Sequence, residues 1–436
     1  MESPAHTPGA SAPTSALPAW YFGLAHLSLG CACLTLLALP DLPGPFFFHP
    51  RMVALVHLLT LGWIAGSILG AYYIVAPLAL RIALPVARHD RWAAAGFWLG
   101  ASGVVSHAWM GRYDGLAWSA ALVLWPVALL LYRTMRGLHA SSAPWPVLLH
   151  IVLGFINMLG AGVYGAVIAW DRSIGSLPLS PMQMAFAHAH LAAVGWAVMF
   201  VVGLGYRLIP MILPGAMPTG ASLAISAVAI EGGLLLVVWG ISTSHALLPW
   251  GATLIVIGLL AFVAQVRRVV RTKLPRPPAL PRRDWSTWHT HVALVWMLVA
   301  LSTGLVLAWN LAGTHGVTLR WIYGLAGLLG FLAQIIVGMQ GRLVPMYAWY
   351  RAWSRRPGPP PSLGANALPR AEGALLVFLA WSIGVPILTW GLTMANVWGI
   401  RLGAAAVLVG LVANGGYLWW MVRRAQRATP STTVTT

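Results

Sequence analysis

Charged residues are scarce in this chain. Lys, Arg, Asp and Glu make up 8% of its 436 residues, whereas 59% of the residues are hydrophobic. A soluble domain of this length cannot hide so much apolar surface from water, so a soluble globular protein is excluded. We therefore expect an all-α, polytopic membrane protein whose main partner is the lipid bilayer.

Cysteine is scarce too. Cys31 and Cys33, both in the first apolar stretch, are the only two, which excludes a disulfide framework. They are either small packing residues or a soft copper ligand pair. No basic residue precedes this stretch, so residues 1–16 do not resemble a secretory signal, and we expect a polar disordered tail there.

Apolar stretches long enough to cross a membrane recur along the chain. A spanning helix needs roughly 20 apolar residues. Twelve such stretches lie near residues 17–40, 51–80, 92–111, 115–133, 146–170, 182–214, 220–243, 247–266, 287–312, 318–346, 371–392 and 396–422. The sequence therefore predicts about twelve transmembrane helices.

The basic residues fall on alternate loops. With the N-terminus inside, all of the 26 Lys and Arg face the cytoplasm except Arg51, Arg112, Arg172, Arg320 and Arg401. Basic loops stay on the cytoplasmic side, so we expect both termini in the cytoplasm of a bacterial inner membrane. Because this rule accounts for the net charge of +18, no nucleic-acid partner is expected.

One pattern occurs three times. Glycine at +5, an aromatic residue at +6, glycine at +13 and proline at +20 follow His57, His190 and Leu325 alike. His26, His150 and His291 stand early in the helix before each copy. We therefore predict three four-helix repeats at 17–136, 145–266 and 287–424, with a basic Pro-rich linker at 267–286 and a cytoplasmic tail at 425–436.

Four histidines share one depth in the membrane. His57, His107, His188 and His190 lie about 10–14 Å below the outer surface at 1.5 Å per residue. Ionisable residues at this depth mark functional sites, and imidazole is the usual nitrogen ligand of haem iron, copper or zinc. Since residues i and i+2 of a helix point about 200° apart, His188 and His190 should face different compartments. A histidine packed against a backbone carbonyl is the alternative for either one.

Other candidates are weaker. His26, His150, His289 and His291 lie toward the cytoplasm, where interfacial histidine is ordinary. Glu231, the only carboxylate well within a span, either handles protons or hydrogen-bonds a neighbouring helix.

Two tryptophans belong to the recurring pattern. Trp63 and Trp196 occupy its +6 position, and we predict that they stack on a macrocycle. Most of the other tryptophans are accounted for by interfacial belts.

These features resemble the haem-copper oxidase subunit I superfamily. The phrases His57-Leu-Leu-Thr-Leu-Gly-Trp and His188-Ala-His190-Leu-Ala-Ala-Val-Gly-Trp are similar to those of atypical oxidase subunit I-like proteins and of NnrS-type haem-copper membrane proteins. The resemblance covers nearly the whole chain. It implies a b-type haem, with copper as a further candidate, and His57 as a haem ligand on the second helix.

The sequence departs from that family at the oxygen-reducing centre. Leu325 stands where the tenth helix of an oxidase carries histidines, and the seventh and eighth helices lack the adjacent histidine pair. The resemblance then implies a rotated arrangement, in which His188 and His190 resemble the pair of the tenth helix and His57 and His107 match the copper ligands. A cofactor would lie between the second and sixth helices.

We therefore expect a haem-binding, electron-transferring or nitric oxide-handling oxidoreductase without the usual oxygen-reducing centre. A quinol or a cytochrome is the expected electron donor. The alternatives are a membrane transporter that uses Glu231, and a non-catalytic module for oxidase assembly or haem storage.

Overall fold

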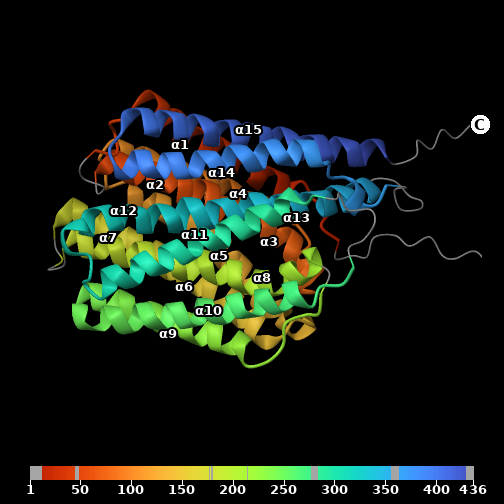
Figure 1. The fold of residues 1–436 in the computed structure, drawn as a ribbon, viewed down its shortest axis with the longest axis horizontal. Helices are drawn as coiled ribbons and strands as arrows, with labels where there is room; N and C mark the ends of the chain where they lie inside the picture. Colours follow the sequence, from red (N-terminus) through yellow and green to blue (C-terminus); the bar gives the residue numbers. More distant parts are fainter. Residues whose placement is uncertain are drawn as a thin grey trace, which may run out of the picture.

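The protein is a bundle of long helices that lie side by side along its longest axis (Figure 1). The computed structural model describes residues 12–44, 49–175, 177, 180–213, 215–275, 283–354 and 363–428. Within these ranges all regular structure is helical. The all-α prediction is thus confirmed for the described chain.

Nine of the elements are uninterrupted long α-helices. They are α1 (Leu17–Ala38), α4 (Arg88–Trp109), α5 (Leu116–Gly137), α6 (Trp145–Ile174), α9 (Ser222–Ser242), α10 (Leu248–Arg271), α11 (Trp285–Ala308), α14 (Ala371–Thr393) and α15 (Val397–Arg427). Short 3₁₀ turns at Leu138–Ala140, His245–Leu247, Gly313–His315 and Ala365–Ala367 lie at their ends or connections.

Three further helices each contain a π-helical segment of eight residues. These helices are α2 (Pro50–His57), η1 (Leu58–Ala65) and α3 (Gly66–Ala79); α7 (Pro181–His190), η3 (Leu191–Val198) and α8 (Met199–Ile212); and α12 (Gly316–Leu325), η6 (Ala326–Ala333) and α13 (Gln334–Trp353). The π segments begin directly after His57, His190 and Leu325, the three starting points of the sequence pattern.

Eleven helical stretches of the described chain are long and apolar enough to cross a membrane. This makes the protein a multi-pass membrane protein, as expected. The remaining predicted span, near residues 92–111, forms α4. This helix has 22 residues but is less apolar than the eleven others. Its charged first turn and its glycines, serines and His107 make it more polar than the others.

The helices form a closed ring around a centre. α5 packs against α6, α10 against α11, and α15 against α1, so the last helix closes the ring on the first. The segments η1, η3 and η6 contact one another inside this ring. The π segments therefore lie in the interior of the protein.

Glycine sets the register between the central helices and the ring. A Cβ atom on Gly70 would lie 2.7 Å from the Cβ of Tyr21, and one on Gly203 or Gly338 would lie 2.7 or 2.9 Å from the Cβ of His150 or His289. The residues at one equivalent position are therefore Tyr21, His150 and His289. Of the histidines expected early in these helices, His150 occupies this position, whereas His26 and His291 do not.

The boundaries of the predicted linker also need correction. α10 continues to Arg271 and α11 begins at Trp285, so the first part of 267–286 is helical. Residues 276–282 lie outside the described residues, as do 1–11 of the predicted N-terminal tail and 429–436 of the C-terminal one. The C-terminal tail is also shorter than predicted, because α15 extends to Arg427.

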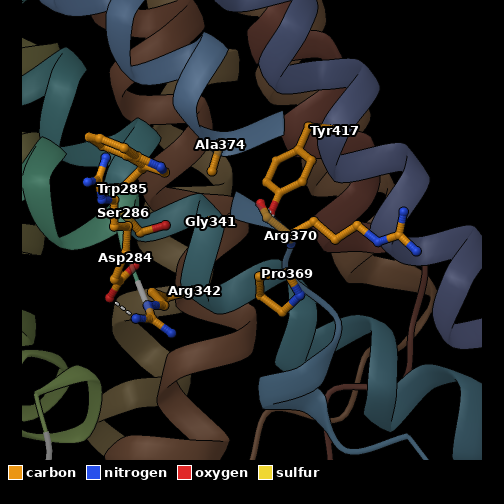
Figure 2. A pocket seen from close by; sticks show the side chains of 10 residues that line it. Asp284, Trp285, Ser286, Gly341, Arg342, Pro369, Arg370, Ala374 and Tyr417 are labelled. Carbon is orange, nitrogen blue, oxygen red and sulfur yellow. Dashed lines mark hydrogen bonds and ion pairs between the residues drawn. The ribbon is translucent and has the colours of Figure 1, made fainter. Parts of the chain in front are cut away.

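Two arginines, Arg342 of α13 and Arg370 directly before α14, lie together at one end of the bundle. Figure 2 shows a pocket there that includes Asp284, Arg342, Arg370 and Tyr417. Asp284 forms an ion pair with Arg342, and the Tyr417 hydroxyl donates to the Arg370 carbonyl at 2.8 Å and accepts from the Arg370 amide at 2.9 Å. These bonds join α11 to α13 and α14 to α15. At about 10 Å³ the pocket is too small for a cofactor.

Candidate functional site

His57 and His188 face each other between two central helices. Their ring centres are 6.2 Å apart, and the ring planes differ by 29°. His57 ends α2 and His188 lies in the last turn of α7, so each side chain is placed just before a π segment. Although both helices are surrounded by the ring, neither histidine is fully buried.

Hydrogen bonds determine which nitrogen of each ring is free. Nδ1 of His57 lies 2.8 Å from the Val53 carbonyl, and Nδ1 of His188 lies 2.8 Å from the Ala161 carbonyl of α6. A carbonyl oxygen only accepts, so both Nδ1 atoms carry a proton and donate it. Each Nε2 atom therefore keeps a lone pair, and no described residue forms a hydrogen bond with it.

This is the arrangement in which histidine binds a metal. Metal-binding histidines usually donate their second ring N–H to a carbonyl or carboxylate, which fixes the tautomer and the ring orientation. Gly165 leaves space at this point, because a Cβ atom there would lie 3.0 Å from Cε1 of His188. The pair can therefore offer two oriented nitrogen donors to one ion.

His190 belongs to a different contact. Its Nδ1 donates to the Phe186 carbonyl at 2.8 Å, and its Nε2 accepts from the Tyr323 hydroxyl of α12 at 3.1 Å. His190 thus faces α12 while His188 faces α2 and α6, as the separation of about 200° predicts. Because Tyr323 occupies its Nε2, His190 is not the partner of His57 for a shared ion.

His107 lies apart from this pair. Its ring packs at the connection of α4 and α5, where a Cβ atom on Gly115 would lie 2.3 Å from its Cε1. No ring contact or hydrogen bond joins it to His57, His188 or His190 in the described ranges. Over the same residues, no group of three or more His, Cys, Asp or Glu is arranged to hold a metal ion. The four histidines of similar depth thus form one pair and two separate residues.

The two tryptophans of the pattern pack against protein side chains. Trp63 is fully buried, contacts Trp381 and His26, and its Nε1 donates to the Ala333 carbonyl at 3.4 Å. Trp196 is 2% exposed and packs on aromatic residues of α6 and α8. Both serve the core, and stacking on a macrocycle remains a prediction.

Glu231 forms an interhelical hydrogen bond. Its carboxylate accepts from Nδ2 of Asn157 at 2.8 Å, and the same Nδ2 lies 3.3 Å from the carbonyl of Gly195 in η3. α9, α6 and η3 are thus joined inside the second predicted repeat. This geometry favours the structural interpretation of Glu231.

No protein-family model matches this chain, and no curated protein matches it.

Two of the histidines predicted on the cytoplasmic side have both nitrogens occupied. His150 donates to the Pro146 carbonyl at 2.6 Å and accepts at Nε2 from Ser226 at 2.9 Å. His26 donates to the Phe22 carbonyl at 2.7 Å and accepts from Nδ2 of Asn414 at 3.1 Å. In this structure, both rings are therefore engaged by protein groups.

The cysteines do not form a ligand pair. Cys33 is buried and Cys31 is exposed, so their side chains point to opposite sides of α1. Packing explains Cys33, and copper binding by the two together is not supported.

Sequence reasoning missed Tyr323. This residue stands two positions before Leu325, as His188 stands two positions before His190. Extending the recurring pattern by two residues toward the N-terminus would have found it. The extended pattern then predicts that the residue at this position of one central helix meets the residue at the starting position of a neighbouring one. His188 meets His57 in this way, and Tyr323 meets His190.

Proposed function

We propose that this protein is a haem-binding membrane protein that transfers electrons, and that His57 and His188 together hold one b-type haem. The observation that carries the proposal is a pair of neighbouring imidazoles whose Nδ1 atoms both donate to carbonyls and whose Nε2 atoms form no hydrogen bond with a described residue. A packed pair of aromatic rings also falls at about 4.5–7 Å, so distance alone does not decide. The free Nε2 atoms favour ligation over simple packing.

The spacing of the pair agrees with shared ligation. A metal–nitrogen bond to histidine is about 2.0–2.1 Å, and a ring nitrogen lies about 1.1 Å from its ring centre, so two imidazoles on one ion have centres about 6.3 Å apart. The observed separation is 6.2 Å. Two axial histidines leave no open position on the iron. The proposal is therefore electron transfer, and the chemistry that such a haem supplies is the uptake and release of one electron.

The wider architecture supports the same proposal. The three π segments at equivalent sequence positions, and the recurring contact between the first and second helix of each predicted unit, fit a threefold repeat of four helices. The resemblance to haem-copper oxidase subunit I adds a membrane quinol or a cytochrome as electron donor. The basic end that holds Arg342 and Arg370 would face the cytoplasm.

Absorption spectroscopy of the purified, haem-reconstituted protein tests the proposal. We expect a Soret band with narrow visible bands in the reduced state, typical of six-coordinate iron, and no binding of carbon monoxide. His57→Gly or His188→Gly should leave iron with one ligand, broaden these bands and permit carbon monoxide binding. Added imidazole should restore the original spectrum.

A matched control separates ligation from general damage. His291→Ala changes an exposed histidine of α11 and should leave the spectrum unchanged. The absence of a Soret band in the wild-type protein, or spectra of both glycine variants equal to that of the control, would reject haem ligation by this pair. Copper in metal analysis without any Soret band would assign the same two nitrogens to a copper ion.

A further inference from the structure

A cavity of about 60 Å³ lies where three central helices meet. Its walls come mainly from α3, α8 and α13, for example from Ala71, Leu204 and Ile336, while Phe22 of α1 and Phe262 of α10 complete it. The lining residues of the central helices follow the π segments, whereas His57 and His188 precede them. The cavity and the histidine pair are therefore separate sites.

The wall of this cavity is almost entirely apolar. Among the residues that the structure describes, Ser67 and Gln340 are the only ones with polar side chains that line it. Nε2 of Gln340 donates to the Ser67 hydroxyl at 3.4 Å, and Oε1 of Gln340 accepts from Asn414 at 2.8 Å. A water in a protein interior needs two to four polar partners, and here the polar groups already bind one another. The wall therefore favours an apolar occupant over water.

We propose that this cavity binds a small, uncharged, apolar molecule of the size of a diatomic gas. An apolar cavity of about 150 Å³ in another protein stays dry and takes benzene or xenon, so about 60 Å³ suits an occupant of only a few atoms. Apolar gases dissolve in the hydrocarbon of a bilayer, which surrounds the ring of helices. Among the described residues, the wall has no charged side chain to hold a charged ligand.

Xenon is the probe for this site, because it matches an apolar gas in size and is visible by anomalous diffraction. Crystals of the full-length protein under xenon pressure should show a peak between α3, α8 and α13. Ala71→Leu fills the cavity and should remove the peak. Ile336→Ala enlarges the cavity and should raise its xenon occupancy, whereas Leu379→Ala, at a side chain 45% exposed on α14, should not change it.

Three results would overturn the proposal. They are ordered water in the wild-type cavity, equal xenon occupancy in wild type and Ala71→Leu, and no gain of occupancy in Ile336→Ala. The last comparison keeps the test decisive if Ala71→Leu does not fold. Because xenon binding requires no haem, the experiment is independent of the proposed ligation by His57 and His188.

Discussion

Asn414 joins three helices through buried hydrogen bonds. From α15, its Nδ2 donates to Nε2 of His26 in α1 at 3.1 Å and to Oε1 of Gln340 in α13 at 2.8 Å. The Asn414 side chain is 2% exposed, so water does not replace it as a donor. The substitution Asn414→Ala therefore leaves two acceptors without a partner.

The cost of the unpaired acceptors should exceed that of the lost bonds. An interhelical hydrogen bond in a membrane protein contributes about 0.6 kcal/mol on average, whereas each buried unsatisfied group costs about 1–3 kcal/mol. We expect Asn414→Ala to lower the free energy of unfolding by roughly 2–4 kcal/mol. The triple variant with Asn414→Leu, His26→Phe and Gln340→Met removes Asn414 together with its two acceptors. It should recover part of this loss, since Ser67 then loses its bond to Gln340.

Reversible unfolding in mixed micelles measures both effects. Val412→Ala serves as the control, because Val412 lies on the same helix with 68% of its surface exposed. The reasoning is refuted if Asn414→Ala is as stable as this control. It is refuted equally if the triple variant is no more stable than Asn414→Ala.

The same assay tests two further features. Asp90 is fully buried and pairs with Arg133. Asp90→Ala should therefore lower the free energy of unfolding by about 3–5 kcal/mol, because it leaves the charge of Arg133 without its partner. A loss below about 1 kcal/mol would contradict this expectation. Gly403→Ala should cost about 1–3 kcal/mol, because its Cβ would lie 2.3 Å from the Leu388 backbone nitrogen. An added Cβ atom on Gly416, in the same helix, would meet nothing within 4 Å, so Gly416→Ala should stabilise the protein by up to about 1 kcal/mol. If Gly416→Ala were less stable than Gly403→Ala, close packing would be excluded as the cause.

The helices could be predicted well from the sequence, because bilayer thickness sets a length that apolar stretches must match. α6 and α15 extend past their predicted ends, since polar and basic side chains continue a helix beyond the apolar core. The glycines of the recurring pattern lie at points of close helix contact, where an added Cβ atom would come within 3.0 Å of a neighbouring helix. The π segments were not foreseen, because a change of hydrogen-bond partner from i−4 to i−5 leaves no mark in hydrophobicity.

The candidate site was predicted in part. Depth along the helix brought His57 and His188 to one level, and helix geometry separated His188 from His190. Depth says nothing of direction around the helix axis, and for this reason His107 was grouped with residues that it does not contact. The Ala161 carbonyl, which fixes the tautomer of His188, comes from another helix and has no signature in the sequence.

The π segments have a consequence for how the central helices are organised. Their wider turn changes the phase of the helix, so the face before a π segment and the face after it are offset in angle. Each half of such a helix can then present its own side chains inward without constraint from the other half. In this bundle, the histidine pair lies before the π segments and the apolar cavity lies after them.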